Sequence, residues 1–430
     1  MDRATRPLAR NAVGALAGLR VIDFTQMLAG PFCTQILADH GADVIKIEAL
    51  SGDGTRSTGP FADDDAQREF GGYFQSVNRN KRSIALDLKT ARGREIAERL
   101  IAGADIVVEN FRSGVMERLG LAYERLRETN PRLVYGAVRG FGDPRSGTSP
   151  YAQWPAYDVV SQAMGGMMGI TGPDRDTPTK IGPGVGDTVP ALMLCIGILA
   201  AVHRARESGE GQFVDVAMTD CVLALCERIV YQTSYGGVVP APEGNHHPLL
   251  CPFGLFRALD GWVSIACAHD GFWATLAAAI GRPELAHDPD FATNAARVRN
   301  AGRVVETIEA FASVRTKEAL AQCLGGTVPF GPVYTSAEIF ADAHFRAREM
   351  LVEVEQPGSR RAVSIAGVPI KLSRTPGAVH RRAPLLGEHT ESILRDAGYA
   401  GDEIEALHAA GAVRSQAQAP VAARANGDQA

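Results

Sequence analysis

The sequence has few of the features that mark disulfide-bonded or metal-bound proteins. Its seven cysteines are odd in number and scattered along 430 residues, and no two of them form a C-x-x-C pair. This spacing provides neither a disulfide framework nor a zinc site, and it fits a reducing compartment. We therefore expect a cytoplasmic protein without a bound metal.

An excess of basic charge and long apolar runs are also missing. The formal net charge is -5, which gives no electrostatic reason to expect nucleic acid or an anionic membrane as a partner. The longest apolar run, Val189–Val202, contains Pro190 and Gly197 and is shorter than the ~20 residues of a membrane-spanning helix. Residues 1–15 lack the apolar stretch of a secretory signal, and we expect a short flexible extension there.

The motifs of nucleotide cofactors and of several hydrolases are absent as well. The turn after the first predicted strand reads TQMLAGP, with Gly30 as its one glycine, where a dinucleotide site needs G-x-G-x-x-G. No Walker loop, HExxH motif or Ser-His-Asp order occurs. These absences argue against NAD and FAD. A phosphate-bearing ligand at the start of the helix near Gly30 stays compatible with the sequence.

The first half of the chain does contain an alternation of β-rich and helical segments. The predicted strands cover residues 20–24, 44–47, 82–88, 105–111 and 132–138. Buried strands that alternate with helices are typical of an α/β protein with a parallel sheet.

The second half predicts a separate, smaller domain. Residues 211–234 read as a strand and a helix, after which Pro240, Pro242 and Pro248 break the periodicity and mark a crossover or hinge. Residues 254–267 alternate like a hairpin with Asp260-Gly261 at its turn. We therefore expect a flexible extension over 1–15, a large domain over 16–230, a linker and small domain over 231–340, a return to the large domain over 341–408 and a disordered tail over 409–430.

One segment, GPGVGDTVPALMLCIGILAA over 182–201, raises a question of function. It places Asp187 and Thr188 at the mouth of a long apolar helix, after glycines at alternate positions. Either side chain can cap the helix by accepting a hydrogen bond from a free backbone N–H. Alternatively, the glycines clear space around a carboxylate that takes part in chemistry. The segment alone leaves both interpretations open.

Two other polar segments allow both a structural and a functional interpretation. NRNKRS at 78–83 is expected to be a solvated loop, although Lys81 and Arg82 could meet phosphates. Asp158 follows Tyr157 at a predicted helix start and is expected to cap that helix.

Nine segments, taken in order, resemble the class III CoA-transferases. They are LRVIDFTQMLAGPFCTQILADHGADVIKIE (19–48), GDGTR (52–56), NRNKRSIALDLK (78–89), ADIVVENFRSGVMERLGL (104–121), NPRLVYGAVRGFG (130–142), PAYDVVSQAMGGMMGITG (155–172), GVGD (184–187), GEGQFVDVAMTD (209–220) and PLLGEHT (384–390). This family includes formyl-CoA:oxalate, carnitine and succinyl-CoA:glutarate transferases, with α-methylacyl-CoA racemase as a side branch. Their order and approximate spacing match the family over residues 16–395.

The resemblance implies that Asp187, which ends the GVGD segment, is the nucleophile. Its carboxylate would attack the thioester of a donor and carry first the acyl group and then CoA. Aspartate is ionised at neutral pH without special tuning. Water must be excluded because an anhydride hydrolyses. No permanently bound cofactor is implied, and coenzyme A enters as a substrate.

The resemblance also implies a set of residues that contact CoA, the apolar ones along the pantetheine arm and the cationic ones near the phosphates. They are Gln26, Leu28, Ala29, Leu86, Lys89, Asn110, Phe111, Arg118, Leu119, Ala156, Tyr157 and Met218.

Three positions depart from the formyl-CoA transferase pattern. Leu28 stands where that enzyme has a glutamine, which argues against oxalate as the acceptor. Ala49 stands where it has an arginine, which leaves a contact to a nucleotide phosphate unassigned. Residues 243–254 (EGNHHPLLCPFG) replace a run of four glycines that closes over the intermediate, so we expect a different lid or a larger acceptor.

The exchanged acids are left open, and a second reaction class is considered. Arg56, His246 and His247 are polar enough to meet a second carboxylate, so we expect succinyl-CoA or a similar donor and a dicarboxylate such as succinate or glutarate. The alternative is a racemase or isomerase that exchanges a proton α to the thioester. That branch has a histidine where this chain has Tyr157, and tyrosine lacks a pKa near neutrality. A catalytically silent CoA-binding paralogue is a third alternative.

The family's architecture implies an α/β fold with a Rossmann-like large domain, a parallel sheet and a smaller α+β domain. The large domain would be formed by both chain ends, and two chains would make an intertwined homodimer. The expected partners are acyl-CoA, small carboxylic acids and a second copy of the chain, with no nucleic acid and no membrane.

Overall fold

The protein is described by a computed structural model that covers residues 14–65 and 68–416. The chain divides into two compact units. The first unit is formed by the chain up to Gly165, by Pro183–Cys226 and by the chain from His344 onward. The second is formed by Gly166–Gly182 and Glu227–Ala343. The predicted segment 231–340 lies within the second unit, which also takes residues 166–182.

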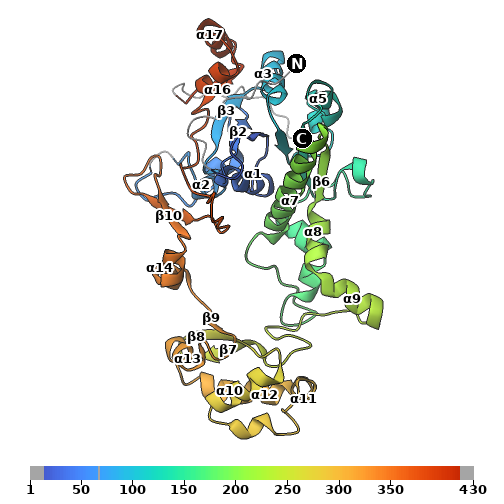
Figure 1. Ribbon diagram of the computed structural model, residues 1–430, viewed down its shortest axis with the longest axis vertical. Coiled ribbons are helices and arrows are strands. Elements are labelled where there is room, and N and C mark those ends of the chain that lie inside the picture. Colours follow the sequence, from blue (N-terminus) through green and yellow to red (C-terminus); the bar gives the residue numbers. More distant parts are fainter. Residues whose placement is uncertain (1–13, 66–67, 417–430) are drawn as a thin grey trace. The chain divides into compact units, whose positions relative to one another are not determined.

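The first unit is built on a seven-stranded sheet in the order β12-β3-β2-β1-β4-β5-β6. Its strands β2, β3 and β6 are labelled in Figure 1. The strands are β1 (Arg20–Asp23), β2 (Asp43–Glu48), β3 (Arg82–Leu86), β4 (Ile106–Glu109), β5 (Val134–Arg139), β6 (Phe213–Ala217) and β12 (Val413–Arg414). All neighbours are parallel except β12 and β3. The predicted α/β fold with a parallel sheet is confirmed.

Alternate strand residues face two separate cores, one on each side of this sheet. Val107 packs in one core with α3 (Ala91–Ala102), α4 (Val115–Arg118), α5 (Tyr123–Thr129), α16 (Thr390–Asp396) and α17 (Gly401–Ala409). Ile106 and Val108 pack in the other core with α1 (Ala29–Asp39) and α7 (Val185–Ser208). Each apolar side chain of this size stabilises the fold by about 1.5–3 kcal/mol when buried.

Shorter elements complete the first unit. They are η1 (Gly54–Ser57), α2 (Gly72–Asn78), η2 (Pro144–Ser146), α6 (Asp158–Met164), α8 (Met218–Leu225), α15 (Ala343–Ala347) and the two-stranded sheet of β10 (Leu351–Val354) and β11 (Val363–Ala366).

The prediction of a disordered tail from residue 409 is wrong for its first part. Val413 and Arg414 form β12, which pairs with Leu86 and Ala85 of β3, and Val413 is buried in the core. A two-residue edge strand is too short to leave a periodic pattern in the sequence. Residues 417–430, and residues 1–13 of the predicted extension, lie outside the described part of the chain.

The second unit has its own antiparallel sheet in the order β7-β8-β9. Its elements are η3 (Met167–Ile170), α9 (Glu227–Gly236), β7 (Phe253–Ala258), β8 (Gly261–Ala266), α10 (Asp270–Ala279), η4 (Pro283–Ala286), α11 (Asn294–Arg299), α12 (Ala301–Ala312), α13 (Lys317–Leu324), β9 (Phe330–Pro332) and α14 (Ser336–Ala341). Phe256, Trp273 and Ile308 lie in its core. The predicted hairpin is present, but its turn lies one residue earlier than expected: Ala258 pairs with Gly261, so the two loop residues are Leu259 and Asp260.

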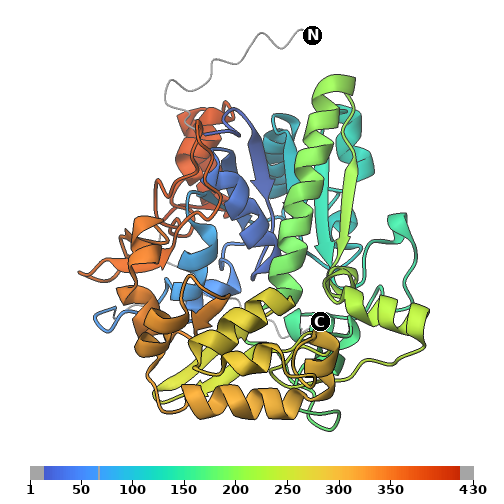
Figure 2. The same ribbon diagram turned by 60° about the horizontal axis from the view of Figure 1, so that its bottom comes forward.

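Helix α7 is longer than the apolar run that identifies it. It lies against the sheet of the first unit (Figures 1 and 2), where Leu194 and Ile198 are fully buried. With 24 residues it is long and apolar enough to cross a membrane, which corrects the expectation drawn from Val189–Val202 alone. The core helix of a soluble protein can have the same length and composition, and one side of α7 does pack in the core.

Candidate active site

Asp187 lies in the first turn of α7, where it does not cap the helix. The N-cap residue is Gly184, and no side chain of the cap residue bonds to the backbone there. Instead, Asp158 of α6 accepts a hydrogen bond from the Gly186 N–H at 2.8 Å. The helix-cap interpretation of Asp187 and Thr188 is therefore wrong, because a carboxylate from a different helix takes that part.

Asp158 is held firmly in this position. Gln162, one turn further along α6, donates from its Nε2 to both carboxylate oxygens at 2.8 and 3.0 Å. The N-cap of α6 is Tyr157, and Asp158 belongs to the first turn of that helix. The expectation that Asp158 caps its own helix is therefore wrong. Its side chain joins the start of α6 to the start of α7.

The glycines before Asp187 are needed for close approach. A Cβ on Gly186 would lie 2.6 Å from the carbonyl oxygen of Asp158, and a Cβ on Gly184 would lie 3.2 Å from Cδ2 of Leu28. A real Cβ essentially never lies that close to a backbone oxygen, so residue 186 must be glycine for α6 and α7 to meet. The same contacts place Leu28, from the turn after β1, beside the start of α7.

The environment of Asp187 makes its carboxyl group unusual. Burial, and then the negative charge of Asp158, raise the pKa of Asp187 to about 7. Among the residues that the structure describes, none donates a hydrogen bond to this carboxylate. The expectation that Asp187 is fully ionised at neutral pH without tuning is therefore corrected. A partly desolvated, unpaired carboxylate of this kind is a candidate nucleophile.

Tyr73 is a site residue that the sequence analysis missed. It lies on α2 and is half buried, and its pKa is raised by burial and then by the charges of Asp187, Asp53 and Asp158. The phenol therefore lies close enough to the two carboxylates at the start of α7 for their charges to act on it. Its sequence signal was its place five residues before the NRNKRS segment. A phenol O–H there can donate to a bound carboxylate or carbonyl.

Two of the predicted CoA-contact segments lie together at the carboxyl edge of the sheet. Asn110, after β4, binds the backbone of Gln26, after β1, through two hydrogen bonds of 2.8 and 2.7 Å. Gln26 is exposed, whereas Leu28 and Phe111 are half-buried. Ligands of open α/β sheets bind at this edge.

The other predicted CoA-contact residues fall into two groups. Exposed or half-buried side chains that a ligand can reach are those of Lys89, Arg118, Leu119, Ala156 and Tyr157. Ala29, Leu86 and Met218 are almost completely buried in the core, so their side chains are not free to contact a ligand. That CoA binds along the first group stays a prediction.

The predicted acceptor residue Arg56 is already occupied by another carboxylate. It is buried and donates to Glu48 through two hydrogen bonds of 2.8 and 2.7 Å, with its guanidinium stacked on Phe74. A bidentate pair of this kind leaves little capacity for a substrate carboxylate. Ala49, after β2, is exposed and offers no charge to a phosphate.

The NRNKRS segment is not a solvated loop. Lys81 is fully buried, lies 3.0 Å from Asp23 and donates to the carbonyl oxygen of Pro31 at 3.0 Å. Arg82 pairs with Asp43 at 2.8 Å. Lys81 thus bonds to the first turn of α1, and Arg82 joins β3 to β2, so both basic charges are used within the fold.

His246 and His247 belong to the second unit and are both exposed. Nδ1 of His247 accepts from the Leu249 N–H at 3.0 Å, and the His247 N–H donates to the carbonyl oxygen of Phe253 at 2.8 Å. Both histidines line a cavity of about 240 Å³ together with Glu243. Residues 243–254, the segment expected to replace a glycine lid, thus form a loop that is held by its own hydrogen bonds.

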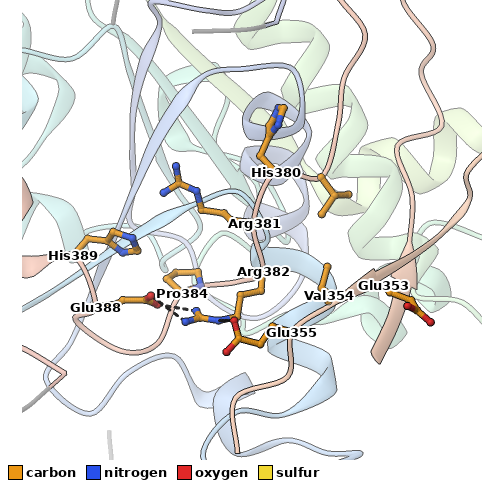
Figure 3. A pocket seen from close by; sticks show the side chains of 10 residues that line it. Glu353, Val354, Glu355, His380, Arg381, Arg382, Pro384, Glu388 and His389 are labelled. Carbon is orange, nitrogen blue, oxygen red and sulfur yellow. Dashed lines mark hydrogen bonds and ion pairs between the residues drawn. The ribbon is translucent and has the colours of Figure 1, made fainter. Parts of the chain in front are cut away.

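A larger cavity, of about 440 Å³, lies in the first unit away from the predicted site residues. Its lining includes Glu355, Arg381 and His389, and Arg382 pairs there with Glu388 at 2.8 Å (Figure 3). None of the predicted CoA or acceptor residues lines it. Within residues 14–65 and 68–416, no three His, Cys, Asp or Glu side chains gather as metal ligands.

Comparisons of the sequence and of the fold with known proteins point to one family. The sequence pattern described as CoA-transferase family III matches residues 16–390. The chain is 49% identical to a succinyl-CoA:mesaconate CoA-transferase of Haloarcula hispanica over 90% of its length and 97% of the relative. It is 38% identical to a succinate–glutarate CoA-transferase of Agrobacterium fabrum, over 89% and 95% of the two chains.

A solved structure agrees. The crystal structure of a CAIB/BAIF family protein from Brucella suis has a TM-score of 0.79 and 38% identity, and the match covers 90% of this chain and all of that one. The family match includes Asp187 and every strand of the seven-stranded sheet except β12. The chain therefore belongs to CoA-transferase family III and is an enzyme of the CoA-transferase class.

Proposed function

We propose that this enzyme transfers CoA from succinyl-CoA to a second dicarboxylic acid, with Asp187 as the covalent carrier. The observation that carries the proposal is the place of Asp187, a half-buried carboxylate in the first turn of α7 to which no residue in the described part of the chain donates a hydrogen bond. Burial and the charge of Asp158 raise its pKa to about 7. A carboxylate with these surroundings is poorly solvated and is free to attack a carbonyl carbon.

The reaction then runs through two anhydrides and one thioester. The Asp187 carboxylate attacks the thioester carbonyl of the donor, and the C–S bond breaks to give a mixed anhydride and CoA thiolate. The thiolate attacks the carbonyl carbon of Asp187, and the donor acid leaves as a carboxylate. The acceptor carboxylate attacks the resulting aspartyl thioester and releases CoA thiolate. The thiolate finally attacks the acceptor carbonyl of the new anhydride and frees Asp187.

Residues around Asp187 support these steps without forming bonds to the substrate carbon. Gly184 and Gly186 let the start of α7 approach α6 and the turn after β1. Tyr73 can donate a hydrogen bond to the oxyanion that develops on the attacked carbonyl. Asp158 keeps a negative charge close to Asp187, which disfavours the ionised carboxylate before attack and is relieved when the anhydride forms.

The choice of acids rests on the relatives and on Leu28. Both relatives described above are named for succinyl-CoA or succinate and for a second dicarboxylic acid. An apolar residue at position 28 suits a carbon chain longer than that of oxalate. We propose a four- or five-carbon dicarboxylate as the acceptor and coenzyme A as the substrate that is shared, with no permanently bound cofactor.

A racemase is disfavoured at the same site. It needs a second base with a pKa near neutrality on the other side of the α carbon. Position 157 is a tyrosine whose side chain is 63% exposed, so it does not supply that base.

We also propose that the enzyme is an intertwined homodimer in the cytoplasm. An exposed apolar face of α7 is formed by Leu192, Met193, Ile196 and Leu199, and exposed apolar faces of this kind are typical of interaction surfaces. All seven cysteines are free thiols, as expected in a reducing compartment. Light scattering of the wild type tests the dimer: we expect the mass of two chains, and a monomeric wild type overturns the proposal.

The substrates can be identified with a matrix of donors and acceptors. Purified enzyme is incubated with succinyl-CoA, acetyl-CoA or formyl-CoA and with mesaconate, glutarate, malate, citramalate or oxalate, and new acyl-CoA products are read by mass spectrometry. We expect products from succinyl-CoA with the four- and five-carbon acids. Transfer to oxalate alone, with no product from the four- and five-carbon acids, would contradict the proposed substrate class.

A further inference from the structure

The turn after β1 is held by a side chain and not by the sheet. The ladder between β1 and β4 ends where the Phe24 N–H donates to the carbonyl oxygen of Val108 at 2.9 Å. Two residues later, Oδ1 of Asn110 accepts from the Gln26 N–H at 2.8 Å, and its Nδ2 donates to the Gln26 carbonyl oxygen at 2.7 Å. One side-chain amide thus continues the pairing that another strand residue would make.

We call the two hydrogen bonds between the Asn110 amide and the Gln26 backbone the Asn110 clamp. The residue after Gln26 has an unfavourable backbone conformation. Met27 has a φ of 66°, in the left-handed region that L residues other than glycine rarely adopt. Its side chain is 38% exposed, so packing does little to fix it. Leu28 follows and lies beside Gly184 at the start of α7. The two hydrogen bonds of Asn110 thus hold the first residue of the Gln26–Leu28 turn, and Leu28 connects this turn to the helix of Asp187.

Asn110 is itself held by a buried ion pair. The neighbouring Glu109 is fully buried and accepts from the Phe111 N–H at 2.7 Å. Arg139 of β5 donates from Nε to the Phe111 carbonyl oxygen at 3.2 Å and pairs with both Glu109 and Asp143. The backbone on the carboxyl side of Asn110 is therefore bonded at both its N–H and its C=O.

We propose that Asn110 is a positioning residue for the CoA thioester: its amide acts on the Gln26–Leu28 turn and not on CoA, and the Glu109–Arg139 pair holds Asn110 in place. This differs from the expectation that Asn110 contacts CoA directly. The inference rests on the proposed function, because it assigns the turn to acyl-CoA binding.

The first test removes the clamp. In Asn110→Ala we expect the KM for acyl-CoA to rise about tenfold, from the loss of two hydrogen bonds, while kcat and the KM for the acceptor acid change less than about threefold. Hydrogen exchange of the peptide containing Gln26 should become faster in the ligand-free protein. Unchanged exchange overturns the inference, and it can be measured even if the enzyme transfers no CoA.

A matched control separates positioning from general stability. Asn130 in the same unit also uses its Nδ2 to hold backbone, donating to the carbonyl oxygens of Ile101 and Ala104 at 3.2 and 2.8 Å. Asn130→Ala should lower thermal stability and leave both KM values unchanged. If it raises the KM for acyl-CoA as much as Asn110→Ala does, the effect is one of stability and the inference fails.

A rescue experiment separates positioning from direct contact. Glycine adopts a positive φ without restraint. In the Asn110→Ala background, Met27→Gly should therefore lower the KM for acyl-CoA most of the way back to the wild-type value, whereas Met27→Ala should not. If Asn110 acts by touching CoA, neither substitution restores the KM, and that result overturns the inference. If the wild type transfers CoA between no pair of substrates, the proposed function fails, and the exchange experiment still decides whether the clamp exists.

Discussion

Asp158 accepts a hydrogen bond from the backbone N–H of Gly186 at 2.8 Å, which fixes a second carboxylate next to the residue that precedes Asp187. The start of α7 is thereby capped by another helix, and Asp187 is left without a structural task. The same contact places two negative charges close together. Both consequences can be tested.

Asp187 should set the acid limb of the pH profile. With a pKa raised to about 7 by burial and then by Asp158, activity should fall about tenfold for each pH unit below 7, because only the ionised carboxylate attacks. Asp158→Asn keeps an oxygen that can accept from Gly186 and removes the charge. The midpoint of kcat/KM against pH should then move to lower pH, although not to the ordinary aspartate range, since burial remains. An unmoved midpoint would show that Asp158 does not influence the nucleophile.

The same raised pKa predicts a gain in stability when Asp187 loses its charge. A carboxyl group whose pKa is higher in the folded protein contributes stability below about pH 4, and this contribution is lost as the pH rises through about 7. Asp187→Asn should therefore stabilise the protein relative to wild type at pH 8, on the order of 1–3 kcal/mol, and less at pH 5. Urea unfolding at both pH values measures this difference, and an equal effect at both would argue against a buried charge.

Gly186 should tolerate no side chain, whereas Gly182 should. A Cβ at residue 186 would meet the Asp158 carbonyl oxygen at 2.6 Å, and a Cβ at residue 182 would meet nothing within 4 Å. Gly186→Ala should cost about 1–3 kcal/mol of stability and lower kcat/KM at least tenfold, because α6 and α7 must separate. Gly182→Ala is the matched control and should change neither. Equal effects in kinetics and calorimetry would remove the close-approach explanation.

Arg56 should be needed for stability and not for recognition of the acceptor. Removing it leaves Glu48 buried without its partner, so Arg56→Ala should destabilise the fold by about 3–5 kcal/mol. Arg92→Ala, which breaks the exposed Arg92–Glu95 pair, should change stability by less than about 0.5 kcal/mol. A folded Arg56→Ala variant with normal stability and a raised KM for the acid alone would restore Arg56 to the acceptor site.

The parallel sheet could be predicted from the sequence because each strand is apolar and each is followed by a helix. The predicted strand at 20–24 is one residue longer than β1 at its end, and the predicted strand at 44–47 is one residue shorter than β2 at each end. Strand β12 was not predicted, because a strand of two residues is too short to show an alternating hydrophobic pattern. Residues 166–182 were assigned to the large domain because nothing local shows that the Gly244 N–H bonds to the carbonyl oxygen of Gly172.

The site could be predicted in position but not in its partners. The GVGD segment identified Asp187, and comparison with the family pattern identified Leu28 and Ala49 as positions that differ from formyl-CoA transferase. Spacing could not show that Glu48 pairs with Arg56, or that Asp158 bonds to Gly186, because both pairings depend on how distant segments pack. Burial also decides the pKa of Asp187, and burial is a property of the fold and not of the motif.

The most direct test is to trap the group that Asp187 carries. The enzyme is incubated with succinyl-CoA, quenched with hydroxylamine and digested, and the peptide containing Asp187 is examined by mass spectrometry beside that of Asp187→Asn. We predict a hydroxamate on Asp187 in the wild type and none in the variant, which should still bind CoA. Formation of acyl-CoA product by a wild-type enzyme that leaves Asp187 unmodified would contradict the account.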